Sequence, residues 1–132
     1  MISALDSSII LDVLTDSPQF SDSSEMLLRR AMAEGKLVIG ECVLAEIAPA
    51  FADEKSLRQF LEDWQIEFIP SSLDSAILAG ANFNRYLARG GHAGRIVADF
   101  LIGAHAVFHA DRLLARDRGF LRDYFSKLTV LG

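Results

Sequence analysis

Four acidic residues stand at positions where polar side chains can do chemistry. Asp6 ends the first apolar run of the chain, Glu46 lies on a helical stretch after the second, Asp99 begins the most apolar helical segment, and Asp117 follows a later run that ends at Ala115. Ligands bind beyond the carboxyl ends of the strands in an open parallel sheet. If the runs are parallel strands, we expect the four acids to converge at one edge of the sheet.

Four converging carboxylates repel one another, and they stay ionised together only if a divalent cation neutralises them. Ligands that are all oxygen atoms favour Mg²⁺ or Mn²⁺. Such ions position a water molecule, lower its pKa and stabilise charge on a phosphodiester during in-line attack. This chemistry needs no nucleophilic side chain. The sequence contains no nucleophile elbow, no P-loop and no H-E-x-x-H metal-binding motif.

Each acid also has a structural interpretation. Asp99 can cap a helix, Asp6 can begin a turn, Asp117 can lie in a loop, and Glu46 can lie on a solvent face. These are the common uses of single Asp and Glu residues. Only the joint placement of the four favours a metal site.

The elements that must position these acids alternate between strand and helix. We expect strands at residues 2–5, 37–39, 66–69, 112–115 and 128–131. We expect helices at about residues 9–14, 21–34, 41–50, 54–64, 73–89, 98–110 and 119–125, with Ser21 to Ser24 as N-cap candidates for the second of them. The alternation predicts an α/β fold: one domain over residues 1–132, with a mostly parallel sheet and helices on both faces.

Composition restricts the class of protein further. The chain has 132 residues, of which 51% are hydrophobic and 23% charged, as in one compact domain. The most apolar stretch, residues 100–110, contains His105 and His109 and is too short to span a bilayer. Residues 1–14 carry no basic leader, and a single cysteine, Cys42, excludes an internal disulfide. We expect a cytosolic protein.

The net charge of −5 is unevenly distributed. Residues 1–84 hold 14 acids and 5 bases, whereas residues 85–132 hold 4 acids and 8 bases. Seven of the ten arginines lie in the second part, where guanidinium groups can meet phosphates or a partner's carboxylates. A solvated charged face is the simpler interpretation, because charge pattern alone speaks about association and not about fold.

The order and surroundings of the four acids resemble the PIN-domain ribonucleases, especially the VapC toxins of prokaryotic toxin-antitoxin modules. The similarity spans nearly the whole chain. The more specific segments are D-F-L-I-G-A-H-A from Asp99 and L-x-x-R-D-R-G-F from Leu113, and the weaker ones are L-D-S-S from Leu5 and V-L-A-E-I from Val43. Where this family often has Thr or Ser before the last Asp motif, the chain has Ala115.

The resemblance implies a Rossmann-like PIN fold and a Mg²⁺- or Mn²⁺-dependent endoribonuclease that leaves a 5′-phosphate and a 3′-hydroxyl. By the same resemblance, Asp6, Asp99 and Asp117 are metal ligands, Glu46 is a ligand or base, and Ser8 is an auxiliary polar residue. The implied partners are RNA, a VapB-type antitoxin and a second copy of the chain.

Three arginines near these motifs, Arg95, Arg116 and Arg118, are candidates to contact RNA phosphates, because so acidic a site must offset its repulsion of RNA. They can equally pair with antitoxin carboxylates or with neighbouring acids. His105 is expected to be a histidine satisfied in the core or at an interface. Gly103 is expected to permit close helix packing.

Two other functions remain open from the sequence. A catalytically silent PIN-like module would bind RNA or a protein and would bind metal without cutting RNA. A phosphate-accepting receiver domain shares the alternating layout, but it needs an acidic pair after the first strand and a suitably placed lysine, which this chain lacks.

Overall fold

A computed structural model describes residues 1–91, 97–116 and 123–132 of the chain. Its sheet has the strand order β3-β2-β1-β4-β5, and every neighbouring pair is parallel. The strands are β1 (Ile2–Leu5), β2 (Lys36–Ile39), β3 (Ile66–Phe68), β4 (Arg112–Leu114) and β5 (Val130–Leu131). The predicted parallel α/β sheet is therefore confirmed, with strand ends shifted by one or two residues.

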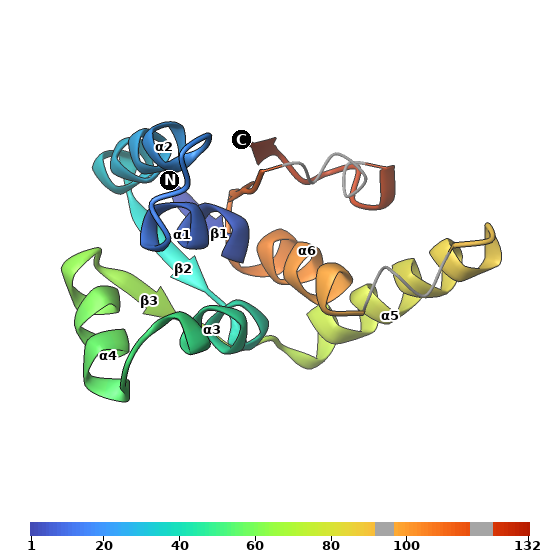
Figure 1. The fold of residues 1–132 in the computed structure, drawn as a ribbon. Coiled ribbons are helices and arrows are strands. Elements are labelled where there is room, and N and C mark those ends of the chain that lie inside the picture. The colour runs from blue at the N-terminus through green and yellow to red at the C-terminus, as the bar shows by residue number, and fades with distance from the viewer. Residues whose placement is uncertain (92–96, 117–122) are drawn as a thin grey trace.

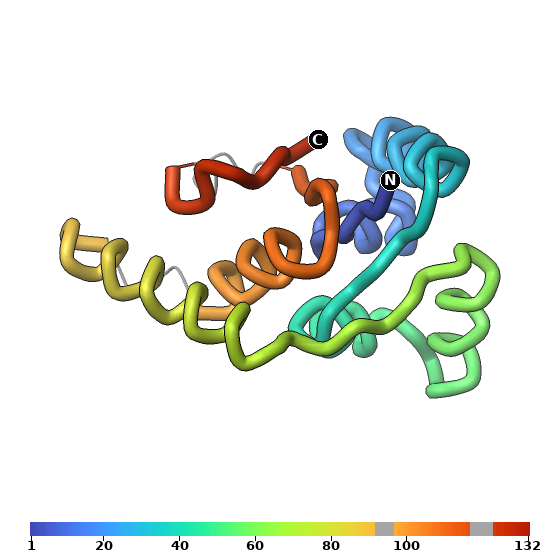
Figure 2. The backbone as a smooth tube through the Cα atoms, turned by 180° about the vertical axis from the view of Figure 1, so that it is seen from behind, coloured from blue at the N-terminus to red at the C-terminus, as the bar shows by residue number. Residues whose placement is uncertain are grey.

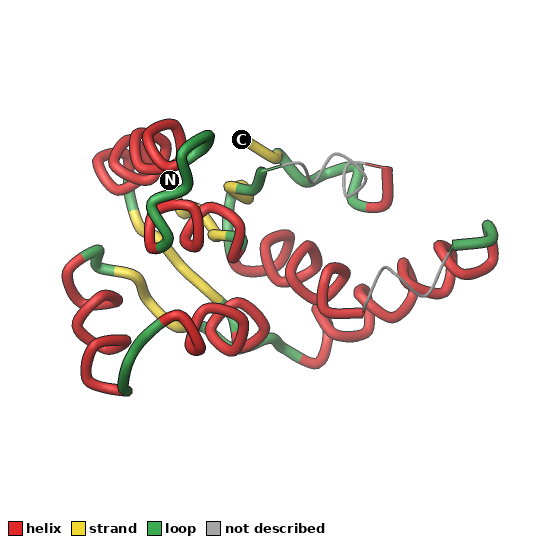
Figure 3. Tube along the Cα trace, viewed as in Figure 1, coloured by secondary structure: helices red, strands yellow, loops and turns green. Residues whose placement is uncertain are grey.

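The helices surround these short strands (Figure 3). They are α1 (Ser7–Leu14), α2 (Ser21–Glu34), α3 (Glu41–Ile47), α4 (Glu54–Asp63), α5 (Leu73–Ala88) and α6 (Val97–His109). Pro49 ends regular α-helical structure after α3, and the chain continues as a short 3-10 turn, η1 (Ala48–Ala50). Most of the predicted helix at 119–125 lies outside the described residues.

The strand order explains why both faces of the sheet are covered. The chain moves outward from β1 to β2 and β3, and then returns past β1 to pair β4 on its other side. Right-handed crossovers place helices from these two directions on opposite faces. In Figure 1, α2 lies on one side of the sheet, and α6 lies on the other, where it packs against β1 and β4.

The core lies between these layers. β1, β2 and β4 are almost wholly buried, as expected for strands covered on both faces. Leu5, Ile39 and Leu114 belong to the fully buried set, which Phe100 of α6 completes from one face. The buried central strands therefore support the residues that follow their carboxyl ends.

The start of α2 differs from the sequence prediction. Its N-cap is Phe20, which makes no side-chain cap hydrogen bond, so the capping role predicted for Ser21 to Ser24 is wrong. Ser24 instead donates through Oγ to a carboxylate oxygen of Asp12, 2.7 Å away in α1. The Ser24 hydroxyl therefore acts as a donor to a buried acid on the neighbouring helix and not as an acceptor for the free amides at the start of α2.

An extended link carries the chain from β3 to α5, as Figure 2 shows. Ser72 caps α5 with a reciprocal bond to Ser75, and Ser71 donates through both its amide and its hydroxyl to Glu41 at the start of α3. These bonds hold the start of α5 against the start of α3 at the edge of the sheet.

Candidate functional site

The candidate site lies where the strand order reverses, between the carboxyl ends of β1 and β4. In an open α/β sheet the connections from these two strands leave in opposite directions, and a crevice opens between them. The backbone amide of Asp6 donates to the carbonyl of Leu114 over 2.8 Å, so the two strand ends are hydrogen-bonded up to the rim of this crevice. Asp6 therefore stands at the position expected for a ligand-binding residue.

Asp6 is completely buried, at 0% exposure, and it caps α1. Its Oδ2 accepts from the amide of Ser8 at 3.1 Å and from the Ser8 hydroxyl at 2.5 Å. The same hydroxyl oxygen accepts from the amide of Arg116 at 3.1 Å. Ser8 thus links the carboxylate after β1 to the main chain after β4, and the structure gives it the polar position beside Asp6 that the sequence predicted.

Glu46 reaches the same region from α3. Its Oε1 accepts from the hydroxyl of Ser7 at 3.2 Å, although most of the residue is exposed. Glu46 lies on a solvent-exposed face, as its structural interpretation expected, and that face adjoins the turn that contains Asp6 and Ser7. One hydrogen bond through Ser7 brings the second predicted acid next to the first.

Asp99 lies in the first turn of α6 and is partly buried. Helix α6 packs against β1, β4 and α3, the elements that carry or border Asp6 and Glu46. The N-terminal turn of a helix presents backbone amides and the positive end of the helix dipole, so this end of α6 is a suitable place to bind an anion.

Three of the predicted site residues, Asp117, Arg95 and Arg118, lie outside the described residues. Within residues 1–91, 97–116 and 123–132, no three His, Cys, Asp or Glu side chains are grouped closely enough to hold a metal ion. The four-acid cluster therefore stays a prediction. The oxygen donors of the predicted site that the structure describes, from Asp6, Ser8, Glu46 and Asp99, are of the type that suits Mg²⁺ or Mn²⁺.

Arg116, the candidate RNA contact that the structure describes, forms a two-pronged ion pair with Asp12. Its Nε lies 3.0 Å from Oδ2 and its NH2 2.9 Å from Oδ1 of that acid. Burial raises the pKa of Asp12, but hydrogen bonds from Arg116 and Ser24 and the arginine charge outweigh burial and hold this pKa below 3.8. Pairing with a neighbouring acid, the alternative open from the sequence, is what the structure shows.

The sequence did not point to Asp12 as the partner of Arg116. An acid inside the apolar run 9–14 is the available signal, because such an acid becomes buried and then needs a charged partner. The sequence offered no way to choose that partner among the ten arginines.

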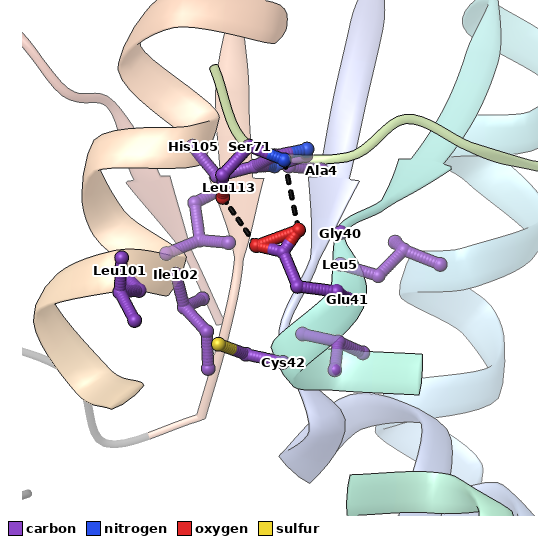
Figure 4. Close-up of a pocket in the computed structure, with 11 residues that line it drawn as sticks. Ala4, Leu5, Gly40, Glu41, Cys42, Ser71, Leu101, Ile102, His105 and Leu113 are labelled. Carbon is purple, nitrogen blue, oxygen red and sulfur yellow. Dashed lines mark hydrogen bonds between the residues drawn. The ribbon is translucent and has the colours of Figure 1, made fainter. Parts of the chain in front are cut away.

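A small pocket lies close by, between β1, α3 and α6 (Figure 4). His105 projects into it, is 4% exposed, and donates from Nε2 to the carbonyl of Ile69 over 2.6 Å. Burial lowers the pKa of His105, and the bond to Ile69 opposes this effect only in part. The prediction of a satisfied core histidine is confirmed. Cys42 also lines this pocket, and burial raises the pKa of its thiol, which makes it a poor nucleophile.

Comparison with known protein families matches residues 4–125 to the PIN domain. The chain therefore belongs to the PIN domain family, in agreement with its parallel sheet.

Solved structures share this fold over nearly the whole chain. VapBC2 from Rickettsia felis bound to a DNA fragment from their promoter matches with a TM-score of 0.72 and 22% identity, covering 98% of this chain and 97% of that one. VapBC-1 from nontypeable Haemophilus influenzae gives 0.71 and 18%, covering 98% and 96%. FitAcB from Neisseria gonorrhoeae gives 0.66 and 18%, covering 100% and 97%. No curated protein matches the chain significantly.

None of the helices in the described parts of the chain is long and apolar enough to cross a membrane.

Proposed function

We propose that this chain is a metal-dependent endoribonuclease of the VapC type, the toxin of a toxin-antitoxin pair. The observation that carries the proposal is the buried carboxylate of Asp6, fixed by Ser8 in the crevice between β1 and β4. Membership of the PIN family and the likeness of the fold to VapBC structures support it.

The proposed metal is Mg²⁺ or Mn²⁺, held by Asp6, Asp99 and Asp117, with Glu46 as a further ligand or as a base. When bound, the metal lowers the pKa of water and stabilises negative charge on the phosphodiester. The donor set supports a hard cation, since it consists of carboxylate and hydroxyl oxygens.

The chain's own residues have distinct roles in this proposal. Ser8 holds Oδ2 of Asp6 and so fixes the direction of the carboxylate at the rim of the crevice. Glu46 is the proposed base that takes a proton from an attacking water molecule, and its bond from Ser7 and its exposure to solvent support this role. Attack on phosphorus then expels the 3′-oxygen of the preceding nucleotide, which leaves a 5′-phosphate and a 3′-hydroxyl on the RNA.

The proposed partners follow from the VapC assignment. They are an RNA substrate, a VapB-type antitoxin that inhibits cleavage, and a second copy of the chain in a homodimer. The proposed compartment is the cytoplasm, where an RNA target and an antitoxin are both present.

The deciding experiment incubates the purified chain, free of any inhibitor, with total cellular RNA and Mn²⁺ or Mg²⁺, beside an EDTA control. We expect cuts with 5′-phosphate ends that EDTA and the substitutions Asp6→Asn and Asp99→Asn each abolish. Asp74→Asn is the matched control, because Asp74 occupies the first turn of α5 as Asp99 occupies that of α6. This control should cut as fast as the unmodified chain.

Two outcomes would contradict the proposal. Full activity of Asp6→Asn or Asp99→Asn would remove the acids from the mechanism. Metal binding without cleavage of any RNA would favour the silent PIN-like binding module instead.

A further inference from the structure

The contacts of Arg116 and Asp12 form a continuous path from α2 to the candidate site. Ser24 of α2 donates to Asp12 of α1, and Asp12 receives the two-pronged bond from Arg116. The guanidinium carbon of Arg116 also lies 4.1 Å from the ring centroid of Phe20, in the loop before α2. Two segments, α1 and the loop before α2, therefore hold the Arg116 side chain, and α2 holds Asp12 in turn.

The main chain of that residue touches the site. The Arg116 amide donates to the Ser8 hydroxyl, which donates to Oδ2 of Asp6. Arg116 is also the residue before Asp117 in the sequence. The guanidinium contacts and this amide bond together fix the backbone just after β4, beside Asp6, one of the proposed metal ligands.

The exposures of the pair argue for a structural use of this charge. The Asp12 side chain is 5% exposed and that of Arg116 is 32% exposed. A buried carboxylate that loses its partner is strongly unfavourable, so Asp12 competes with any phosphate for this arginine. The planar fork of Arg matches a carboxylate in two parallel bonds, which sets its direction as well as its distance.

From these contacts we infer that Asp12 and Arg116 are positioning residues that set the affinity of the site for its metal, and that Arg116 is not a phosphate contact. The inference rests on the proposed function. It assigns a role to Asp12, which lies outside the acidic site, and it removes Arg116 from the proposed RNA-binding surface.

The test measures Mn²⁺ binding by calorimetry on the full chain without RNA, for Asp12→Asn, Arg116→Ala and the double variant. Residues that orient metal ligands typically change affinity about 10- to 100-fold. We expect about a tenfold loss in each single variant and no further loss in the double variant, because both substitutions break the same link. Glu54→Gln, which breaks the exposed Glu54–Arg58 pair, is the control and should bind as the unmodified chain does.

A second measurement separates positioning from phosphate contact. RNA binding in EDTA is followed against salt for the same variants. If Arg116 contacts a phosphate, Arg116→Ala lowers the slope of RNA affinity against salt by about one. In that case Asp12→Asn, which releases the arginine, strengthens RNA binding. We expect equal slopes for all variants. Arg116→Lys, which keeps the charge but loses the fork, should show an intermediate loss of Mn²⁺ affinity even if the other variants fold poorly.

The outcomes distinguish this inference from the function on which it rests. Unmodified chain that binds Mn²⁺ and cuts RNA, with variants that bind Mn²⁺ equally well, would overturn the inference alone. Unmodified chain that binds no Mn²⁺ would overturn both. A lower salt slope in Arg116→Ala together with tighter RNA binding in Asp12→Asn would return Arg116 to the RNA-binding surface.

Discussion

Gly103 shows how closely α6 is packed at the level of single atoms. A Cβ at this position would lie 2.6 Å from the ring of Phe125, which is itself 3% exposed. The predicted role of Gly103 in close helix packing is therefore confirmed.

We expect Gly103→Ala to lower the free energy of unfolding by about 1–3 kcal/mol, because an added methyl group must displace a buried ring. Gly80 is the control, since it lies in α5 with nothing within 4 Å of the corresponding Cβ. Gly80→Ala should raise the free energy of unfolding by about 0.5–1 kcal/mol through helix propensity. Urea unfolding followed by circular dichroism measures both, and equal effects in the two variants would contradict the packing argument.

His105 gives the molecule a predictable response to pH. Its pKa in the folded chain lies below 6.5, mainly because of burial, so the unfolded chain binds a proton more readily. Stability should therefore be full above about pH 7 and fall as pH drops through 6.5 toward the folded pKa. Glu41 and His109 also face this ring, and the pKa of Glu41 is lowered, so its own contribution disappears only at more acidic pH.

The check on this prediction is thermal unfolding of the unmodified chain and of His105→Gln between pH 7.5 and about 5.5, a range chosen around the ordinary histidine pKa. The variant keeps an N–H donor for the Ile69 carbonyl but does not titrate. We expect the unmodified chain to lose stability with acid more steeply than His105→Gln. Parallel curves would show that another group causes the slope.

At the residue scale, the sequence predicted the positions of some side chains but not the partners of others. The location of Asp6 was predictable, because an acid that directly follows a buried parallel strand lies at the carboxyl edge of the sheet. The partner of Arg116 was not, since the ion pair joins residues 104 positions apart and depends on how α1 lies against the end of β4. Long-range pairs of this kind leave no local spacing to read.

At the scale of elements, two arginines contact the same acid from very different surroundings. Arg112 of β4 is 8% exposed and bonds Ser3 of β1 and Glu34 of α2. Arg30 lies on α2 itself, 3.3 Å from Glu34, with 68% of its side chain exposed. The contacts of Arg112 join β4 to both β1 and α2, whereas the Arg30–Glu34 pair lies within one helix.

We expect Arg112→Ala to cost about 1–3 kcal/mol of unfolding free energy, because it leaves the buried Ser3 hydroxyl without its donor. Arg30→Ala should change stability by less than about 0.5 kcal/mol, as exposed pairs within a helix usually do. Chemical denaturation of the two variants provides the comparison. Similar losses in both would mean that burial does not set the strength of these contacts.

Element boundaries were largely predictable from local pattern, and α2 was placed at residues 21–34 from the sequence alone. Its cap was not, because Ser24 responds to Asp12 on another helix rather than to its own backbone. Local propensity places an element, while tertiary contacts decide what its polar side chains do.

At the scale of the whole molecule, α5 carries an apolar stripe in which Leu73, Ile77 and Leu87 are 77%, 60% and 47% exposed. Figure 1 shows this helix reaching away from the sheet. The proposed homodimer would cover such a surface.

We therefore expect sedimentation velocity to show a dimer that Ile77→Glu converts to a monomer, since the substitution places a charge in the stripe. Glu67→Gln is a control on exposed β3, away from α5, and should stay dimeric. If the unmodified chain sediments as a monomer, that result would contradict the proposed homodimer.

The pairing of β1 with β4 also sets an order of events during synthesis. Ile2 and Asp111 are hydrogen-bonded across 109 positions of the chain, and Asp6 meets Leu114 in the same way. The central strand β1 is synthesised long before its neighbour β4, so it stays unpaired on that side until β4 has been made. The two sides of the proposed site therefore come together only after β4 has been synthesised, so that a growing chain shorter than this carries no assembled site.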